Sequence, residues 1–259
     1  MKPTKSHTYD NDYHYHLQAA VYSLIREGGL TNLHEKNGYK FFCFSNIFPF
    51  GNFKTNEEKK LLISSPSKGI MQAIVQSIRN KIRTNEELKV GDMAFQIVRF
   101  EGPFRLRLSK PRAKVRTETP IIVRIPSYNL VNLQGINKNI TKYKYVYWRE
   151  TIPPTYFHDQ LYDNMEKKIK EYAVLFGSDN FIRFLSLGVN VPKPSLLRFI
   201  KTVSKRITVR GIEHVVIGSL WEFEFLFDTI IETQMLEFIL DCGLGERNSL
   251  GFGFCNVTG

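Results

Sequence analysis

A loop dense in glycine near the end of the chain restricts what the surrounding sequence can form. Residues 243–253 read Gly-Leu-Gly-Glu-Arg-Asn-Ser-Leu-Gly-Phe-Gly and hold four of the seventeen glycines in the 259-residue sequence. Glycine costs conformational entropy on folding, so this density indicates positive φ angles or a close approach of the backbone to another group. Successive N–H groups in such a loop can bind an anion, and we predict a phosphate contact there. A mobile turn near the C-terminus is the competing interpretation.

Two familiar glycine motifs are excluded by the residues and by their context. The loop has no Gly-Lys-Ser/Thr ending, and Asn248 occupies the third glycine position of the dinucleotide-binding motif. The loop also follows a predicted helix at residues 230–241 and precedes an apolar strand at 252–257. Both motifs require the opposite order, with a strand before the glycines and a helix after them.

The charge balance indicates a polyanionic partner. The chain has 36 Lys and Arg against 25 Asp and Glu, a net charge of +11, and nucleic acid is the partner we predict. No apolar run approaches the length of a membrane span and no signal peptide opens the sequence, so we expect a cytoplasmic protein with no membrane partner. Cys43, Cys242 and Cys255 form no C-x-x-C pair and are interpreted as buried apolar side chains.

The first half of the chain predicts a ferredoxin-like unit that lacks its opening strand. Residues 1–12 are polar and interrupted by Pro3, so they predict no strand. The apolar period predicts a helix at residues 13–26, with Tyr22 outside the buried stripe and pointing toward solvent or a ligand. The stripe consists of Leu17, Ala20, Val21, Leu24 and Ile25. The segments that follow predict strands at 39–47 and 60–64, a helix at 67–83 and a strand at 94–100, which is otherwise the ferredoxin-like order.

The strongest basic cluster lies between residues 105 and 124. Pro111 and the charge density predict both a phosphate track and a domain boundary, which divides the chain into residues 1–112 and 113–259. The predicted elements of the second half are strands at 120–125 and 144–149, a helix at 155–176, a β-hairpin at 196–227 and the helix at 230–241. We therefore predict an α+β fold of two tandem ferredoxin-like (RRM-like) domains with a C-terminal glycine-rich loop.

Four stretches, taken in order, are similar to a known family. They are Tyr15-His-Leu-Gln-Ala-Ala-Val-Tyr22, then Leu33-His-Glu35, then Lys40 with the Phe-Phe-Cys-Phe-Ser45 that follows it, and the glycine loop. Together they resemble the CRISPR repeat-processing endoribonucleases, the sixth Cas family of the RAMP superfamily, over nearly the whole chain. The resemblance implies the same two domains. Members of the family usually open with an apolar strand, which this sequence does not predict. A missing strand, a truncated start and irregular pairing of the first residues are the three explanations that stay open.

The resemblance implies a catalytic set of Tyr22, His34 and Lys40. From the residues alone, a surface tyrosine and a solvated loop histidine are the commoner interpretations, although an ordinary histidine pKa of about 6.5 suits proton transfer. The implied reaction is attack of an RNA 2′-hydroxyl on the neighbouring phosphate. Which of His34 and Tyr22 acts as the general acid and which as the general base stays open, and Lys40 offsets the charge of the phosphorane. No metal or cofactor is needed, because the substrate supplies the nucleophile.

The predicted RNA-binding surface combines the glycine loop with the basic cluster through phosphate contacts. Glu246 has two candidate partners, a base edge and the neighbouring Arg247. Recognition of the repeat as a hairpin or as unstructured RNA stays open. The predicted RNA-binding residues are Gly243, Gly245, Glu246, Arg247, Asn248, Ser249, Gly251, Gly253, Arg105, Arg107, Lys110, Arg112, Lys114 and Arg116.

Two other functions compete with repeat processing. The first is a non-catalytic RNA-binding RAMP subunit of a CRISPR effector complex. The second is a metal-dependent nucleic-acid enzyme that uses the histidines and aspartates of residues 7–16, although no i, i+4 histidine pair or cysteine supports it. His14 and His16 are otherwise interpreted as flanking the RNA or capping the helix. The expected partners are precursor and mature CRISPR RNA and other Cas proteins, with a monomer and a homodimer both open.

Overall fold

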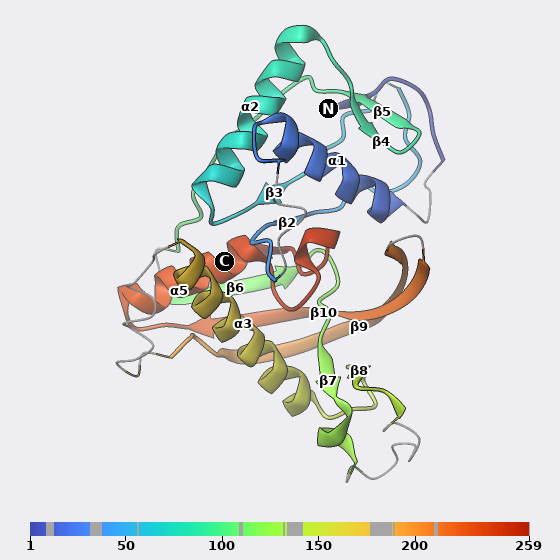
Figure 1. The fold of residues 1–259 in the computed structure, drawn as a ribbon. Helices are drawn as coiled ribbons and strands as arrows, with labels where there is room; N and C mark the ends of the chain where they lie inside the picture. The colour runs from blue at the N-terminus through green and yellow to red at the C-terminus, as the bar shows by residue number, and fades with distance from the viewer. Residues whose placement is uncertain are drawn as a thin grey trace.

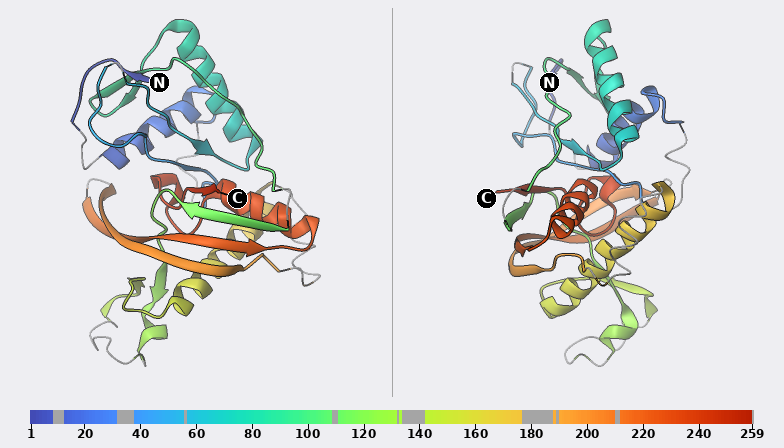
Figure 2. Two further views of the ribbon diagram at one scale, coloured as in Figure 1. Left: turned by 180° about the vertical axis from the view of Figure 1, so that it is seen from behind. Right: turned by 90° about the vertical axis from the view of Figure 1, so that its left-hand side faces the viewer.

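Two α+β units lie one above the other, with the C-terminal loop between them (Figure 1). The computed structural model describes residues 1–8, 13–31, 38–55, 57–108, 111–131, 133, 142–176, 188, 190–209 and 212–258. The upper unit in this view is N-terminal and the lower one is C-terminal, and the connection between them descends along the outside (Figure 2). Within the described residues, no helix is both long and apolar enough to cross a membrane.

The N-terminal unit packs two helices against a set of short strands. Its elements are β1 (Lys2–Pro3), α1 (Tyr13–Glu27), β2 (Cys43–Phe44), β3 (Ile63–Ser64), α2 (Lys68–Thr84), β4 (Leu88–Val90) and β5 (Met93–Gln96). All five residues of the predicted stripe on α1 are buried, as the apolar period indicates. Ser67 caps α2 by accepting a hydrogen bond from the Ile70 backbone N–H, and Asn85 ends the helix in the left-handed conformation.

The prediction of no strand in residues 1–12 is wrong, because β1 pairs antiparallel with β5. Met1 and Lys59 also exchange two backbone hydrogen bonds, of 2.9 and 2.8 Å, on the other side of β1. This joins β1 to the segment leading into β3, which pairs with β2, so the strands follow the ferredoxin-like order. A strand of two residues depends on backbone hydrogen bonds rather than on apolar alternation, so its sequence carried no pattern to detect.

The C-terminal unit has the ferredoxin-like strand order β11-β6-β10-β9 in one antiparallel sheet, which confirms the predicted fold class. Its elements are β6 (Arg112–Thr117), β7 (Arg124–Pro126), β8 (Tyr145–Tyr147), α3 (Pro154–Phe176), β9 (Pro194–Val209), β10 (Ile212–Leu226), α5 (Ile230–Cys242) and β11 (Cys255–Val257). Apolar residues from β6, β10, α3 and α5 form one core, in which Trp221 stacks on Phe157 at 4.4 Å. A capping box of Thr229 and Glu232 begins α5.

β6, a central strand of this sheet, was not predicted from the sequence. Residues 105–124 were predicted to form a basic cluster with a domain boundary, and the first strand of the second unit was predicted at 120–125. In the structure Ala113, Val115 and Thr117 are buried and alternate with exposed Arg112, Lys114 and Arg116. This is the period of a half-buried strand, and the density of charge on its open face concealed it.

Phe41 connects the two units, because it lies in the N-terminal half and packs in the C-terminal core. Its ring meets Tyr172 of α3 edge-on at 5.1 Å and is buried. The Tyr39 backbone N–H donates to the Glu171 carboxylate at 2.9 Å, and the Ser64 hydroxyl donates to Asp241 at 2.5 Å. The segment around Phe41 is thus fixed by α3 as well as by its own unit.

Candidate functional site

The glycine loop lies between the two units, where its short helix η4 (Asn248–Leu250) packs against α1 and β2. A Cβ atom on Gly243 would lie 2.9 Å from the Cys43 Cβ, and one on Gly251 would lie 2.7 Å from the Phe44 ring. The Asn248 amide closes the loop by donating to the carbonyls of Leu244 and Phe252, both at 3.0 Å. The glycines therefore allow this loop to fit closely against the N-terminal unit.

Many backbone N–H groups of the loop already donate to protein carbonyls. The donors are Gly243, Leu244, Glu246, Leu250, Gly251 and Gly253. A phosphate contact from any of these groups would replace an existing hydrogen bond. The phosphate-binding role predicted for the loop is therefore better suited to the partly buried side chains of Arg247 and Ser249 than to the glycine backbone.

Replacement of Gly253 is expected to destabilise the loop strongly. Gly253 has φ +72°, and a Cβ atom there would lie 1.9 Å from the Leu244 carbonyl oxygen. We expect Gly253→Ala to lower the free energy of unfolding by about 3 kcal/mol, measured by urea denaturation. Gly29→Ala is the matched control, because Gly29 also has positive φ but no atom within 4 Å of the added Cβ, so about 1 kcal/mol is expected. Equal losses in the two variants would contradict the packing argument.

Glu246 pairs with Arg124, a partner that was not considered from the sequence. The Glu246 carboxylate accepts hydrogen bonds from the Arg124 guanidinium and from the Arg124 backbone N–H, the latter at 3.3 Å. The Glu246 N–H in turn donates to the Ile122 carbonyl at 2.9 Å. The carboxylate thus anchors the loop to β7, and the Arg124 guanidinium lies over the Tyr145 ring at 5.2 Å. The long separation in sequence made this pair invisible before folding.

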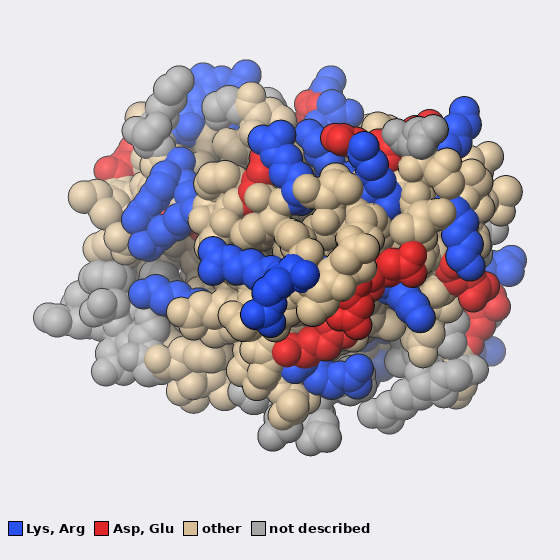
Figure 3. Space-filling view, turned by 90° about the horizontal axis from the view of Figure 1, so that it is seen from above, with Lys and Arg blue, Asp and Glu red and all other residues tan. Residues whose placement is uncertain are grey.

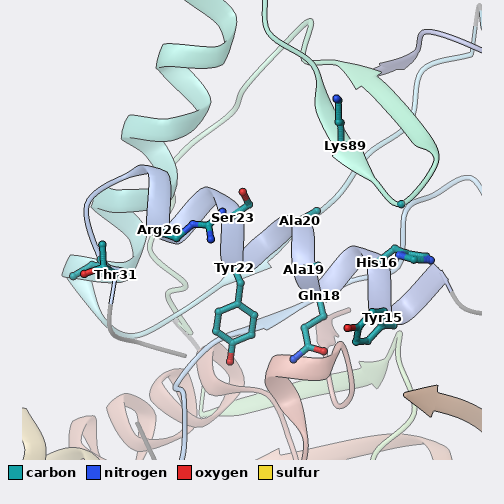
Figure 4. A pocket seen from close by; sticks show the side chains of 12 residues that line it. Tyr15, His16, Gln18, Ala19, Ala20, Tyr22, Ser23, Arg26, Thr31 and Lys89 are labelled. Carbon is teal, nitrogen blue, oxygen red and sulfur yellow. The ribbon is translucent and has the colours of Figure 1, made fainter. Parts of the chain in front are cut away.

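Tyr22 extends from α1 toward the glycine loop rather than into open solvent (Figure 4). Its ring is half-buried, meets Phe42 edge-on at 5.4 Å, and its hydroxyl is hydrogen-bonded to the Ser249 side chain. Burial raises the pKa of Tyr22 above 10.0, although the Ser249 hydrogen bond partly opposes this. The phenol is therefore protonated at neutral pH and can donate a hydrogen bond.

Lys40 lines a small hollow of about 130 Å³ beside the same loop. Ser249 and Arg247 line this hollow too, so Ser249 both lines the Lys40 hollow and is hydrogen-bonded to Tyr22. His34 lies outside the described residues, in the stretch 32–37. The described residues flanking that stretch are Thr31 and Gly38, which line the groove along α1 and the Lys40 hollow respectively.

A groove of about 480 Å³ runs along α1 and has Tyr22 in its wall. Arg26 and Lys89 supply positive charge, and Tyr15, with 45% of its surface exposed, supplies an aromatic face (Figure 4). This combination suits a nucleic-acid strand, since cations attract phosphates and aromatic rings stack on bases. Lys89 was not a candidate from the sequence, because it lies in β4, where no strand was predicted.

The two histidines at the start of α1 have different surroundings. His14 is 3% exposed and its ring stacks on Phe252 at 5.8 Å, so the expectation that it flanks RNA or caps the helix is wrong. Burial, with a smaller effect of Lys205, lowers the pKa of His14 to about 4, which keeps it neutral. His16 is half-exposed and lines the α1 groove. In the part of the chain that the structure describes, which omits residues 9–12, no three His, Cys, Asp or Glu side chains are grouped to hold a metal ion.

The predicted basic cluster is partly neutralised by glutamates. Arg107 pairs with Glu237 at 3.6 Å, Arg112 with Glu224, and Arg116 with Glu222 at 3.9 Å. Arg105 and Lys114 are exposed, and Lys110 lies outside the described residues. Lys and Arg side chains are also spread over the face seen from above the N-terminal unit, interrupted by a band of acidic side chains (Figure 3). Positive charge is therefore distributed over both units rather than concentrated in residues 105–116.

Two ferredoxin-like units with a glycine-rich loop between them form the fold of a solved structure titled "An RAMP protein binding different RNA substrates", with a TM-score of 0.62, 19% identity and coverage of 99% of this chain and 98% of that chain. The family model described as CRISPR associated protein Cas6, C-terminal, matches residues 103–257, and the chain belongs to this family. It is 27% identical over 258 residues to "CRISPR-associated endoribonuclease Cas6 2" of Methanocaldococcus jannaschii, covering 99% of this chain and 96% of that protein. It is also 27% identical to "CRISPR-associated endoribonuclease Cas6" of Haloferax mediterranei over 267 residues, covering 100% and 92%. A solved structure titled "CRISPR associated protein Cas6" shares the fold, with a TM-score of 0.62, 18% identity and coverage of 100% and 96%.

Proposed function

We propose that the protein is an endoribonuclease that cuts CRISPR repeat RNA within a precursor transcript and releases guide RNAs. The observation that carries this proposal is that Ser249 of the glycine loop is hydrogen-bonded to Tyr22 and lines the same hollow as Lys40, in a chain of the Cas6 family. The curated relatives named above are endoribonucleases. The α1 groove, with Tyr22 in its wall, offers an RNA strand a path to this point.

The cleavage step we propose is an internal transesterification. The 2′-hydroxyl of the nucleotide 5′ of the cut attacks the adjacent phosphorus, the P–O5′ bond breaks, and the products are a 2′,3′-cyclic phosphate and a 5′-hydroxyl. Because its raised pKa keeps the Tyr22 phenol protonated, Tyr22 suits hydrogen-bond donation to the reacting phosphate or the leaving oxygen. His34 is then the residue proposed to remove the 2′-hydroxyl proton, and Lys40 offsets the charge of the phosphorane.

A cleavage assay in excess EDTA tests the proposal against its competitors. EDTA removes divalent metal ions from the protein and the buffer, and repeat RNA is then incubated with the protein. We expect cleavage at an unchanged rate, because the substrate supplies the nucleophile. Binding without cleavage, with or without added Mg²⁺ or Mn²⁺, would favour a non-catalytic RNA-binding subunit of an effector complex. Cleavage that is lost in EDTA and restored by a divalent cation would favour a metal-dependent nuclease.

A further inference from the structure

A lysine that is almost completely buried lies directly behind the glycine loop. Lys168, in the middle of α3, is 1% exposed. The side chains of Lys167 and Lys170 on the same helix are 61% and 59% exposed and pair with carboxylates of α3. Burial of an ammonium group is costly unless its donors are matched by acceptors, so Lys168 must be compensated by specific contacts.

All three hydrogen-bond acceptors found for Lys168 among the described residues belong to the glycine loop. The Lys168 Nζ donates to the Gly243 carbonyl at 2.5 Å, to the Gly245 carbonyl at 2.7 Å and to the Asn248 Oδ1 at 2.7 Å. An ammonium group has three N–H donors, and each therefore has one acceptor. Since Asn248 also binds the carbonyls of Leu244 and Phe252, these two side chains together hold the loop from its first residue to its penultimate one.

The same face of α3 holds the segment that carries Lys40. The Asn164 amide donates to the Tyr39 hydroxyl at 3.0 Å, and the Glu171 carboxylate accepts from the Tyr39 backbone N–H at 2.9 Å. Positions 164, 168 and 171 are four and three residues apart, so they lie along one side of the helix. This side of α3 thus fixes Tyr39 on one flank and the glycine loop on the other.

We propose that Lys168 is a positioning residue for the proposed cleavage reaction. Through Asn248 it sets the position of Arg247 and Ser249 relative to Lys40 and Tyr22. Arg247 is the residue before Asn248, and Ser249 is the residue after it. Lys168 does not reach the surface, so its removal takes away no direct contact with RNA, and we expect the larger effect on the reaction rate. The inference rests on the proposed function, because it concerns the geometry of that site.

The ionisation of Lys168 provides a signature that a purely structural residue lacks. Burial lowers the pKa of Lys168 to about 8. The groups facing it are Glu246 and the thiols of Cys43 (β2), Cys242 (α5) and Cys255 (β11), with the Tyr39 ring 5.7 Å from its Nζ. Burial raises the pKa of each of these thiols and raises the pKa of Tyr39 to about 12, so they stay neutral near pH 8. Lys168 therefore loses its proton while the three thiols and the Tyr39 phenol keep theirs.

Loss of that proton leaves two N–H donors facing three acceptors, so one contact with the loop is lost. We expect the wild-type cleavage rate to fall as pH rises through about 8. Stability responds in the opposite direction. Between pH 8 and the ordinary lysine pKa of 10.5, the unfolded chain binds more protons at this residue than the folded chain, so this residue increases stability as pH rises. A loss of activity on the alkaline side would thus not arise from unfolding at this site.

The test compares Lys168→Met with Lys167→Met, which removes a neighbouring exposed lysine from the same helix. Single-turnover cleavage of repeat RNA and RNA affinity are measured at pH 7, and the rate is then followed from pH 6.5 to 9.5. We expect Lys168→Met to cut about 100-fold more slowly with nearly unchanged affinity, and to lack the fall near pH 8. Lys167→Met is expected to retain the wild-type rate and profile.

Three results would overturn the inference. The first is cleavage by Lys168→Met at the wild-type rate. The second is a loss of RNA affinity in this variant as large as its loss of cleavage rate. The third is a decrease in its cleavage rate near pH 8 like that of the wild type. If Lys168→Met does not fold, Lys168→Arg replaces it, because a guanidinium keeps its charge and should move the fall well above pH 8. A fall that stays near pH 8 in Lys168→Arg would also reject the role. If the wild-type protein itself does not cut repeat RNA, the proposed function fails, which is distinguishable from a failure confined to Lys168.

Discussion

A single 2′-deoxy substitution immediately 5′ of the cut is expected to abolish cleavage of repeat RNA while leaving its affinity nearly unchanged. The proposed nucleophile is that hydroxyl, so its removal eliminates the reaction rather than slowing it. One hydroxyl among many phosphate and base contacts contributes little to binding. Cleavage is measured in single-turnover conditions, and affinity by titration of labelled RNA.

The control for this experiment is a 2′-deoxy substitution one nucleotide further from the cut, which should be cleaved normally. The products of unmodified RNA should carry a 2′,3′-cyclic phosphate and a 5′-hydroxyl, because internal attack closes a ring on the ribose and expels the 5′-oxygen. A metal-activated water would tolerate the substitution and leave linear phosphate ends. Continued cutting of the deoxy substrate would remove Tyr22, His34 and Lys40 from their proposed roles, although the chain would remain a member of its family.

Replacement of His34 by alanine is expected to lower the cleavage rate by about 10²–10⁴-fold, the usual contribution of one proton-transfer group. The affinity for repeat RNA should stay close to that of the wild type, because one imidazole supplies little of the phosphate attraction. Single-turnover rates at saturating protein separate this effect from binding.

His214→Ala is the matched control, since His214 is exposed on β10, outside the residues that line the groove and the Lys40 hollow. It should cut at the wild-type rate. Near-normal cutting by the His34 variant would exclude that histidine from the reaction. A parallel loss of affinity and rate would instead assign it to RNA binding.

The sequence predicted those parts of the fold whose pattern is local. The structure confirms the buried stripe of α1, the helix that begins after the capping Thr229, and the long hairpin of β9 and β10. In each of these segments the apolar pattern repeats over several residues. β1 escaped prediction because two residues are too few for a period. β6 was not predicted, because the charged residues on its exposed face concealed the alternation of buried and exposed side chains.

The candidate site was harder to predict, because its contacts join residues far apart in the sequence. Tyr22 was expected to point toward solvent or a ligand, yet its hydroxyl meets Ser249, and the partner of Glu246 is Arg124. Lys168 gave no signal at all, since a lysine in a charged amphipathic helix is normally solvated. Its role depends on three carbonyl and amide oxygens that only the folded loop brings together.

Phe41 makes the stability of each unit depend on its contact with the other unit. Its ring comes from the N-terminal half but fills space in the C-terminal core, against Tyr172 and Phe238. Separation of the halves would expose this ring on one and leave a void in the other, at a combined cost of about 3–5 kcal/mol, as for the loss of a buried phenylalanine. The two units share this contact energy, so each stabilises the other against unfolding.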